Sequence, residues 1–194
     1  MDTDVMITYG ASTKKLKKGE YIFEEGGEPR FFFKILTGAV KMCCMNEEGK
    51  EFIQGIYRAE ESFGEPPLFL NRPYPSSAIA LEDTVLLKLS KDKLFSIIND
   101  YPGVAKNLLH IFAQRVYDKA TALQMLTCPT PERKIIIFLE KLKSQAKINH
   151  KLMIPYTRQQ IADFTGLRVE TVIRTLSKMK NSCKVDIINH KLYY

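Results

Sequence analysis

The pattern of apolar residues changes once along the chain, near residue 90, and this change restricts the possible folds more than any other feature. Before it, short apolar runs are separated by glycine-containing turns, and the runs lie at 21–23, 31–36, 39–45, 52–57 and 84–89. Short runs at regular spacing predict an antiparallel all-β sandwich or barrel. Because no helix-length pattern interrupts them, a doubly wound nucleotide-binding fold is not expected.

After residue 90 the apolar period becomes that of a helix. Ser90 is suited to cap a helix over 91–98, and a longer helical pattern follows over 104–126. Its mostly apolar stripe can pack against its own domain or against the same helix of a second copy. The length of the stripe favours a homodimer. The expected dimer residues are Leu108, Ile111, Phe112, Arg115, Lys119 and Leu123.

The charge of the chain is distributed unevenly. The 29 Lys and Arg residues exceed the 22 Asp and Glu residues, which gives a net charge of +7. Pro129 and Pro131 interrupt any helix and divide the chain into a part of net charge −1 over 1–127 and a part of net charge +8 over 128–194. This asymmetry fits a nucleic-acid-binding module, and it equally fits a solvated basic surface.

Composition excludes several classes of protein. Apolar residues make up 45% of the chain, which excludes a mainly disordered protein. No apolar run approaches the roughly 20 residues of a membrane helix and no signal-like stretch is present, so a membrane is not an expected partner. The four cysteines are too scattered for a disulfide framework or a metal site, which favours a reducing cytoplasm and no bound metal.

The most specific local signal lies in residues 157–179. Thr157 is placed to cap a short helix, and Gly166 stands where a sharp turn needs a positive φ. Ala162 is small where two helices cross, and Val172 begins the apolar face of a second helix. A small residue, a glycine four residues later and a valine ten residues later form the spacing of a helix-turn-helix.

Two further patterns flank this motif. Before it, Thr130 can cap a helix that begins at Pro131, and a polar stretch over 143–150 leads to a short strand at 152–155. After it, apolar runs at 184–188 and 192–194 surround a turn and predict a hairpin, or wing.

The exposed face of the second helix carries side chains that can read DNA. Arg174 can bond to guanine O6 and N7, Glu170 can accept a hydrogen bond from cytosine N4, and Ile173 can contact a thymine methyl group. Glu170 and Arg174 can also pair with each other, since they lie one helical turn apart. The expected DNA-contacting residues are Thr157, Arg158, Gln159, Arg168, Val169, Glu170, Thr171, Ile173, Arg174, Lys178, His190 and Lys191.

From about residue 16 to the C-terminus, the sequence resembles the Crp/Fnr family of bacterial transcription regulators. The segments that carry the resemblance are 18–26, 35–41, 63–65, 157–162 and 170–176. The resemblance implies an α+β chain with an antiparallel, jelly-roll-like β-roll over 1–102, a dimerisation helix over 103–127 and a winged helix-turn-helix over 128–194. It also implies a homodimer that binds a palindromic promoter site in double-stranded DNA and contacts RNA polymerase.

The resemblance also indicates a candidate effector pocket in the roll. Family members that bind cyclic AMP use a Gly-Glu pair for the ribose and a later Arg-Ser pair for the cyclic phosphate. Gly64 and Glu65 match the first pair, but Ser76 stands where the arginine offsets the burial of the phosphate. The candidate pocket consists of Gly64, Glu65, Arg72, Ser76 and Ser77, and no cyclic nucleotide is expected to bind there.

The sequence matches the other cofactor sites of the family no better than it matches the cyclic-nucleotide site. Oxygen-sensing members hold an iron–sulfur cluster with thiolates near the N-terminus, but no cysteine precedes Cys43. A haem needs an axial ligand in the roll or at its exit, and all three histidines lie later in the chain. The remaining alternatives are an unidentified small-molecule effector and no effector at all. The alternative function, a cyclic-nucleotide-binding regulatory module, leaves the basic C-terminal part unused, and no catalytic constellation predicts an enzyme.

Overall fold

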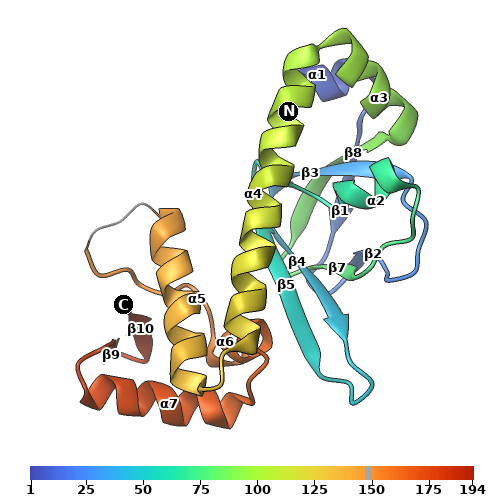
Figure 1. The fold of residues 1–194 in the computed structure, drawn as a ribbon. Helices are drawn as coiled ribbons and strands as arrows, with labels where there is room; N and C mark the ends of the chain where they lie inside the picture. The colour runs from blue at the N-terminus through green and yellow to red at the C-terminus, as the bar shows by residue number, and fades with distance from the viewer. Residues whose placement is uncertain (147–149) are drawn as a thin grey trace. The chain divides into compact units, whose positions relative to one another are not determined.

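The structure is a computed structural model that describes residues 1–146 and 150–194. It contains two compact units, Met1–Ala113 and Gln114–Tyr194, whose boundary falls inside the long helix α4 (Pro102–Thr127). The predicted α+β class is confirmed, with an antiparallel roll, a long helix and a C-terminal winged helix-turn-helix (Figure 1). The sequence-based division treated 103–127 as a separate helix, whereas its two halves pack with different units.

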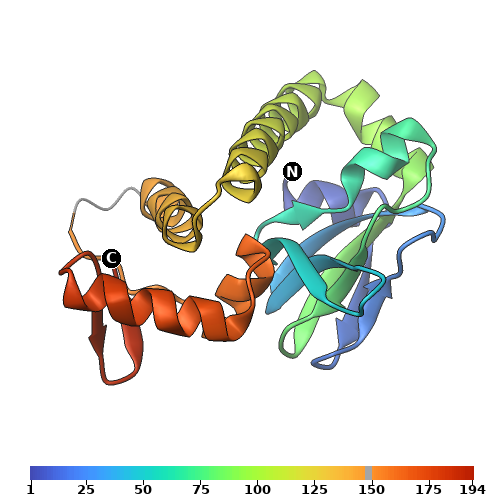
Figure 2. The same cartoon turned by 60° about the horizontal axis from the view of Figure 1, so that its bottom comes forward.

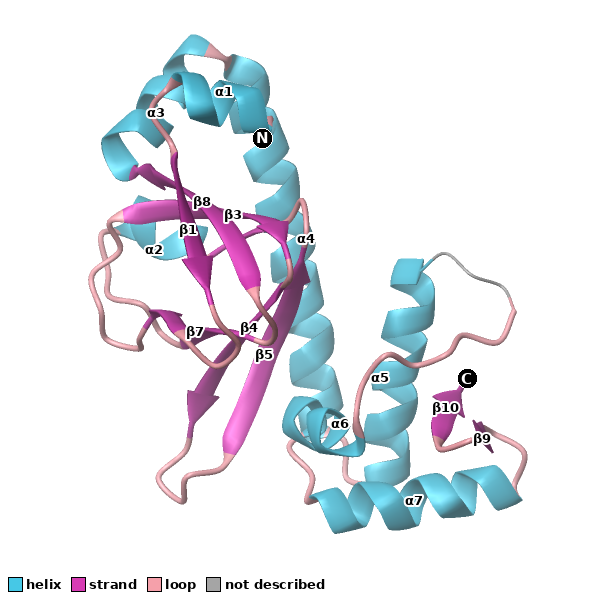
Figure 3. Ribbon diagram, turned by 180° about the vertical axis from the view of Figure 1, so that it is seen from behind, coloured by secondary structure: helices cyan, strands magenta, loops and turns pink. Residues whose placement is uncertain are grey.

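The first unit is a roll of two four-stranded antiparallel sheets with the orders β1-β8-β3-β6 and β2-β7-β4-β5 (Figure 3). Besides the first half of α4, its elements are α1 (Thr3–Thr8), β1 (Ser12–Leu16), β2 (Tyr21–Phe23), β3 (Phe31–Thr37), β4 (Ala39–Met45), β5 (Glu51–Arg58), β6 (Ser62–Phe63), α2 (Glu65–Leu70), β7 (Ser77–Ala80), β8 (Thr84–Ser90) and α3 (Lys91–Asp100).

Strand β3 places its side chains in two separate cores. Phe33 and Ile35 pack between the two sheets, whereas Phe32 packs on the outer face of its sheet, which faces away from the other sheet. There it meets apolar residues from all four helices of the unit, among them Met6 of α1 and Leu108 of α4. Because successive side chains of a strand lie on opposite faces, an almost continuous apolar run fits a strand that is buried on both.

Lys34 is a charged residue within this buried strand. Its ammonium donates hydrogen bonds to the carbonyl oxygen of Met1 at 3.1 Å and to Oγ1 of Thr3 at 3.0 Å. It also pairs with the carboxylate of Glu60 at 2.8 Å. A buried ammonium group is tolerated only when such partners replace water, so these contacts fix the start of α1 against the roll.

The sequence missed α1, α2, β1, β6 and β7. Helix α2 has prolines at its first positions, which read as a loop signal although proline fits the first turn of a helix. Strand β1 is a largely exposed edge strand of polar residues, and β7 is short and has only one large apolar residue, so neither gives a strong strand signal. The helix predicted over 91–98 is α3, but the side chain of Ser90 makes no capping hydrogen bond.

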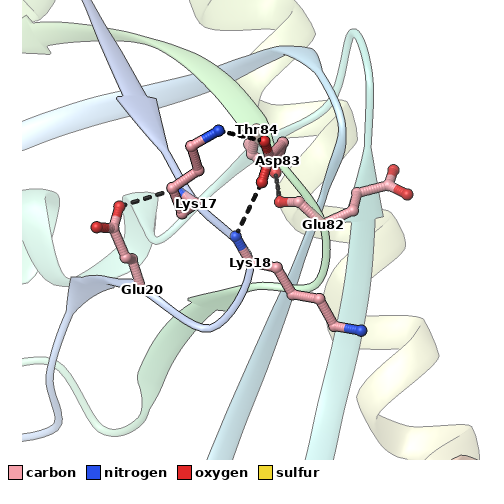
Figure 4. Close-up of polar contacts among 6 residues, drawn as sticks. All are labelled: Lys17, Lys18, Glu20, Glu82, Asp83 and Thr84. Carbon is pink, nitrogen blue, oxygen red and sulfur yellow. Dashed lines mark hydrogen bonds and ion pairs between the residues drawn. The ribbon is translucent and has the colours of Figure 1, made fainter.

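Polar contacts join the turns at one end of the roll (Figure 4). The Asp83 carboxylate accepts hydrogen bonds from Nζ of Lys17 at 2.6 Å and from the backbone N–H of Lys18 at 3.3 Å. The Thr84 hydroxyl donates to the carbonyl oxygen of Glu82 at 2.8 Å. The turn between β7 and β8 is thereby held against the turn between β1 and β2.

The second unit has a core to which α5, α6, α7 and the end of α4 contribute, together with a small sheet (Figure 2). Its elements are the second half of α4, α5 (Pro131–Ala146), α6 (Arg158–Thr165), α7 (Val169–Asn181), β9 (Asp186–Ile188) and β10 (Lys191–Tyr193). Helix α5 extends into the predicted polar stretch as far as Ala146, and 147–149 lie outside the described residues. The predicted strand at 152–155 is a single β-bridge, from Met153 to Tyr193 of β10.

Gly38 is the only residue between β3 and β4, and we expect its replacement by a larger residue to destabilise the roll. Its φ is +90°, and an added Cβ would lie 2.5 Å from Oγ1 of Thr84 and 2.7 Å from the carbonyl oxygen of Asp83. Gly19 has a φ of +89° but no atom within 4 Å of its Cβ position, so Gly19→Ala is a matched control. We expect Gly38→Ala to lower the free energy of unfolding by about 1–3 kcal/mol more than Gly19→Ala in urea titrations. Equal losses would show that the crowding has no effect.

Candidate DNA-binding surface

The start of α6 is fixed by a capping box. Oγ1 of Thr157 accepts a hydrogen bond from the backbone N–H of Gln160 at 3.1 Å. In return, the Gln160 side chain accepts one from the backbone N–H of Thr157 at 2.9 Å. The predicted cap at Thr157 is therefore present, and it leaves other amides of the first turn for an external anion.

The turn from α6 to α7 has the predicted glycine geometry. Gly166 follows the last residue of α6 with a φ of +69°, and its N–H bonds to the carbonyl oxygen of Ala162. Ala162, Val172, Leu176 and Met179 are buried in the core that α6 and α7 share. These contacts fix the crossing of the two helices and therefore determine which face of α7 is exposed.

The outward face of α7 presents the predicted base-reading side chains together. Arg168, Glu170, Arg174 and Lys178 are exposed, and Ile173 between them is 50% exposed. Val169 and Thr171, which the sequence also assigned to this surface, are half-buried. Within the described residues no ion pair joins Glu170 to Arg174, so the simple surface salt bridge considered from the sequence is not observed.

Two predicted phosphate contacts at the start of α6 have neighbours within the protein. Arg158 is half-buried, and this burial lowers its pKa from the ordinary value, although a guanidinium remains charged. Nε2 of Gln159 donates a hydrogen bond to Oδ1 of the buried Asp163 at 2.8 Å. The sequence missed Asp163, because a single carboxylate within a helix shows no pattern that predicts its burial.

The wing is a β-hairpin whose turn has two residues. Asn189 and His190 have φ angles of 48° and 62°, as a type I′ turn requires, and they connect β9 to β10. Lys191 is the first residue of β10 rather than part of the turn, and it pairs with Ile188. His190 and Lys191 are both exposed at the hairpin tip, where the sequence placed a backbone contact.

Helix α4 exposes a different apolar row from the one expected for the dimer. Leu108 is buried and Phe112 is half-buried in the core of the first unit, so their side chains are already used. Ile111 and Arg115 are half-buried, Lys119 is exposed and polar, and only Leu123 of the predicted set is both apolar and well exposed.

The exposed row follows a strict heptad pattern. Leu109, Val116 and Leu123 are 68%, 70% and 63% exposed and lie seven residues apart. Ala113 and Ala120, also exposed, stand between them, so the steps alternate between four and three residues. This is the spacing of coiled-coil core positions.

The candidate effector residues differ in their burial. Glu65 and Ser76 are fully buried, whereas Arg72 is exposed. Oγ of Ser77 accepts a hydrogen bond from the backbone N–H of Glu25 at 3.0 Å. Gly64 precedes α2 with a φ of +75°. Arg72, the arginine nearest to Ser76 in sequence, is therefore not buried together with Glu65 and Ser76.

Among the residues that the structure describes, no group of three or more His, Cys, Asp or Glu side chains is placed to hold a metal ion. All four cysteines are free. No described helix is long and apolar enough to cross a membrane.

Comparison with known proteins supports both units. A family model described as a cyclic nucleotide-binding domain matches residues 13–101, and one described as a Crp-like helix-turn-helix domain matches residues 133–190. The transcriptional activator protein Anr of Pseudomonas aeruginosa is 25% identical over 173 residues, covering 87% of this chain and 70% of Anr.

Solved structures show the same fold. FixK2 from Bradyrhizobium japonicum matches with a TM-score of 0.77 at 21% identity, over 94% of this chain and 91% of that one. The c-di-GMP responsive global regulator CLP from Xanthomonas campestris matches with a TM-score of 0.81 at 16% identity, over 98% of both chains.

The capping box at Thr157 can be tested by a double-mutant cycle. We expect Thr157→Ala to lower the free energy of unfolding by about 1 kcal/mol, because an amide of α6 loses its partner. Since the two side chains act reciprocally, Gln160→Ala should cost less in the Thr157→Ala background than in the original chain. Thermal or urea denaturation of the four proteins measures both effects, and strict additivity would contradict a reciprocal box.

Proposed function

The chain belongs to the Crp/Fnr family of DNA-binding transcription regulators, and we propose that it acts as a homodimer on a two-fold palindromic promoter site. The observation that carries this proposal is the face of α7, where Arg168, Glu170, Ile173, Arg174 and Lys178 are exposed together. A helix that is held by its buried face and carries donors on its outer face can enter the major groove.

The chemistry of this face supports a particular kind of half-site. Arg174, which makes no ion pair with Glu170 in the described residues, can donate two hydrogen bonds to guanine, and Glu170 can accept one from cytosine. Ile173 offers an apolar surface to a thymine methyl group. We therefore expect a G·C pair read by Arg174, flanked by A·T pairs.

Contacts to the DNA backbone would hold α7 in this position. Other amides of the first turn and the Thr157 hydroxyl lie at the start of α6, and His190 and Lys191 lie at the tip of the wing. The groups at the start of α6 and those at the tip of the wing are both of a kind that binds phosphate without reading the base sequence. Gln159 is suited to support these backbone contacts indirectly, because its side-chain amide already donates a hydrogen bond to Asp163.

The heptad row of α4 supports pairing of two chains. Leu109, Ala113, Val116, Ala120 and Leu123 would form the centre of a coiled coil. A two-fold dimer carries two recognition helices and therefore reads a palindrome. Because such a regulator acts at promoters, we propose RNA polymerase as its further partner, in line with the similarity to proteins named transcriptional activators.

Arg174→Ala tests base reading. We expect a loss of about 1–3 kcal/mol in binding free energy on the preferred site and weaker discrimination at one base pair. In gel-shift titrations, the control Lys191→Ala should weaken binding about equally on all sequences and reduce the salt slope by about 1. An equal loss for Arg174→Ala on all sequences would mean that Arg174 contacts only phosphate.

Val116→Lys tests the dimer face. Two lysines opposed in a coiled-coil core would raise the dissociation constant of the dimer by about 100-fold or more, because the charges would be buried without partners. Gln114→Lys, which adds the same charge to an exposed position off the row, should leave the dimer intact. Sedimentation equilibrium of both variants measures this, and an unchanged Val116→Lys dimer would contradict the assignment.

A further inference from the structure

The segment of the roll where a cyclic nucleotide would bind contains a stack of two aromatic rings. The rings of Phe23, at the end of β2, and Tyr74, which follows α2, are parallel, with centroids 3.6 Å apart and an angle of 7° between their planes. Both lie directly on Gly64. A Cβ added there would be 2.9 Å from the ring of Phe23 and 3.4 Å from that of Tyr74.

The position of Tyr74 is fixed from both sides of its backbone. Its carbonyl oxygen accepts a hydrogen bond from the N–H of Gly26 at 2.8 Å, and its N–H donates to the carbonyl oxygen of Gly27 at 2.9 Å. Tyr74 as a residue is only 3% exposed. A ligand could therefore reach the space beside Gly64 only if this ring moved.

The electrostatics of the segment oppose a second anion. Burial, with a further contribution from the Glu65 carboxylate, raises the pKa of Tyr74 to about 12, so the phenol stays neutral. Ser76, which stands in place of the phosphate-binding arginine, is fully buried, and its Oγ has no hydrogen-bond partner in the described part of the chain. A cyclic phosphate placed here would be buried near Glu65 without a guanidinium to offset it.

The residues present therefore do not fit a cyclic nucleotide, and we propose that the Phe23–Tyr74 stack takes its place as a permanent internal filling of the roll. DNA binding by this regulator is then independent of cyclic nucleotides. The inference rests on the proposed DNA-binding function, and it concerns the control of that function.

Helix α2 connects this filling to the dimer helix. Gly64 and the stack lie at the first turn of α2. In the same helix, the ring of Phe69 packs edge-to-face on Phe112 of α4, with centroids 5.4 Å apart at 84°. It also packs on Phe95 of α3, with centroids 5.3 Å apart. By fixing α2, the stack fixes the contact of Phe69 with the helix that carries the dimer face.

Nucleotide binding to the full-length chain gives the first test. Cyclic AMP, cyclic GMP and cyclic di-GMP, each at roughly 1 mM, should neither raise the melting temperature nor release heat in a titration. A melting-temperature rise or a saturable titration with any of the three would overturn the inference. This measurement decides it even if the chain binds no DNA.

DNA binding gives the second test, on a duplex selected from a random pool by the chain without added nucleotide. An effector of this kind changes affinity roughly 5- to 150-fold, so an increase of about fivefold with any nucleotide would contradict the proposal. A constant affinity supports it. Failure to bind any duplex with or without nucleotide would instead remove the proposed function.

Tyr74→Ala tests the role of the filling. Removing the ring should lower both the melting temperature and the DNA affinity, the latter by about fivefold or more if α2 transmits the change. Tyr21→Ala, which removes a half-exposed tyrosine from the same roll, is the matched control and should bind DNA normally. A folded Tyr74→Ala protein with undiminished DNA affinity would overturn the role of the stack. If that variant does not fold, the nucleotide measurements on the original chain decide the proposal.

Discussion

Burial of both faces of the sheet β1-β8-β3-β6 is the constraint on which the first unit depends. One face forms the core of the roll, and the other packs with residues of α1, α2, α3 and the first half of α4. Because Leu108 and Phe112 are used in this second core, the rotation of α4 about its own axis is determined there. The same rotation leaves Leu109 exposed. The start of the candidate dimer face is thus a consequence of how the sheet is covered.

The fold could be predicted where apolar spacing was regular. The runs at 31–36 and 84–89 became central strands, and the capped segments at Thr157 and Thr130 became helices at the expected places. The elements that the sequence did not predict are short or atypical. Pro66 and Pro67 made the segment of α2 resemble a loop, and β1 is a strand because it pairs with β8 rather than because of its own composition. Such elements are specified by contacts distant in sequence, which a local pattern does not contain.

The candidate site, too, was predicted from the sequence only in part. The exposed face of α7 followed from a helix with one clear apolar stripe, so Glu170, Ile173 and Arg174 were correctly placed at the surface. Helix α4 is apolar on more than one side, and periodicity alone does not tell which side its own domain covers. The sequence therefore joined Leu108 and Leu123 into one stripe, whereas the structure separates them.

The two alanines in the heptad row have a consequence for assembly. Small side chains at Ala113 and Ala120 let two helices approach closely, and the same closeness leaves no room for a large residue opposite them. A related chain with leucine or isoleucine at these positions would be held at a greater distance and would lose the packing of its neighbours. If two copies pair through this row as proposed, the two alanines therefore restrict which helices can pack against it.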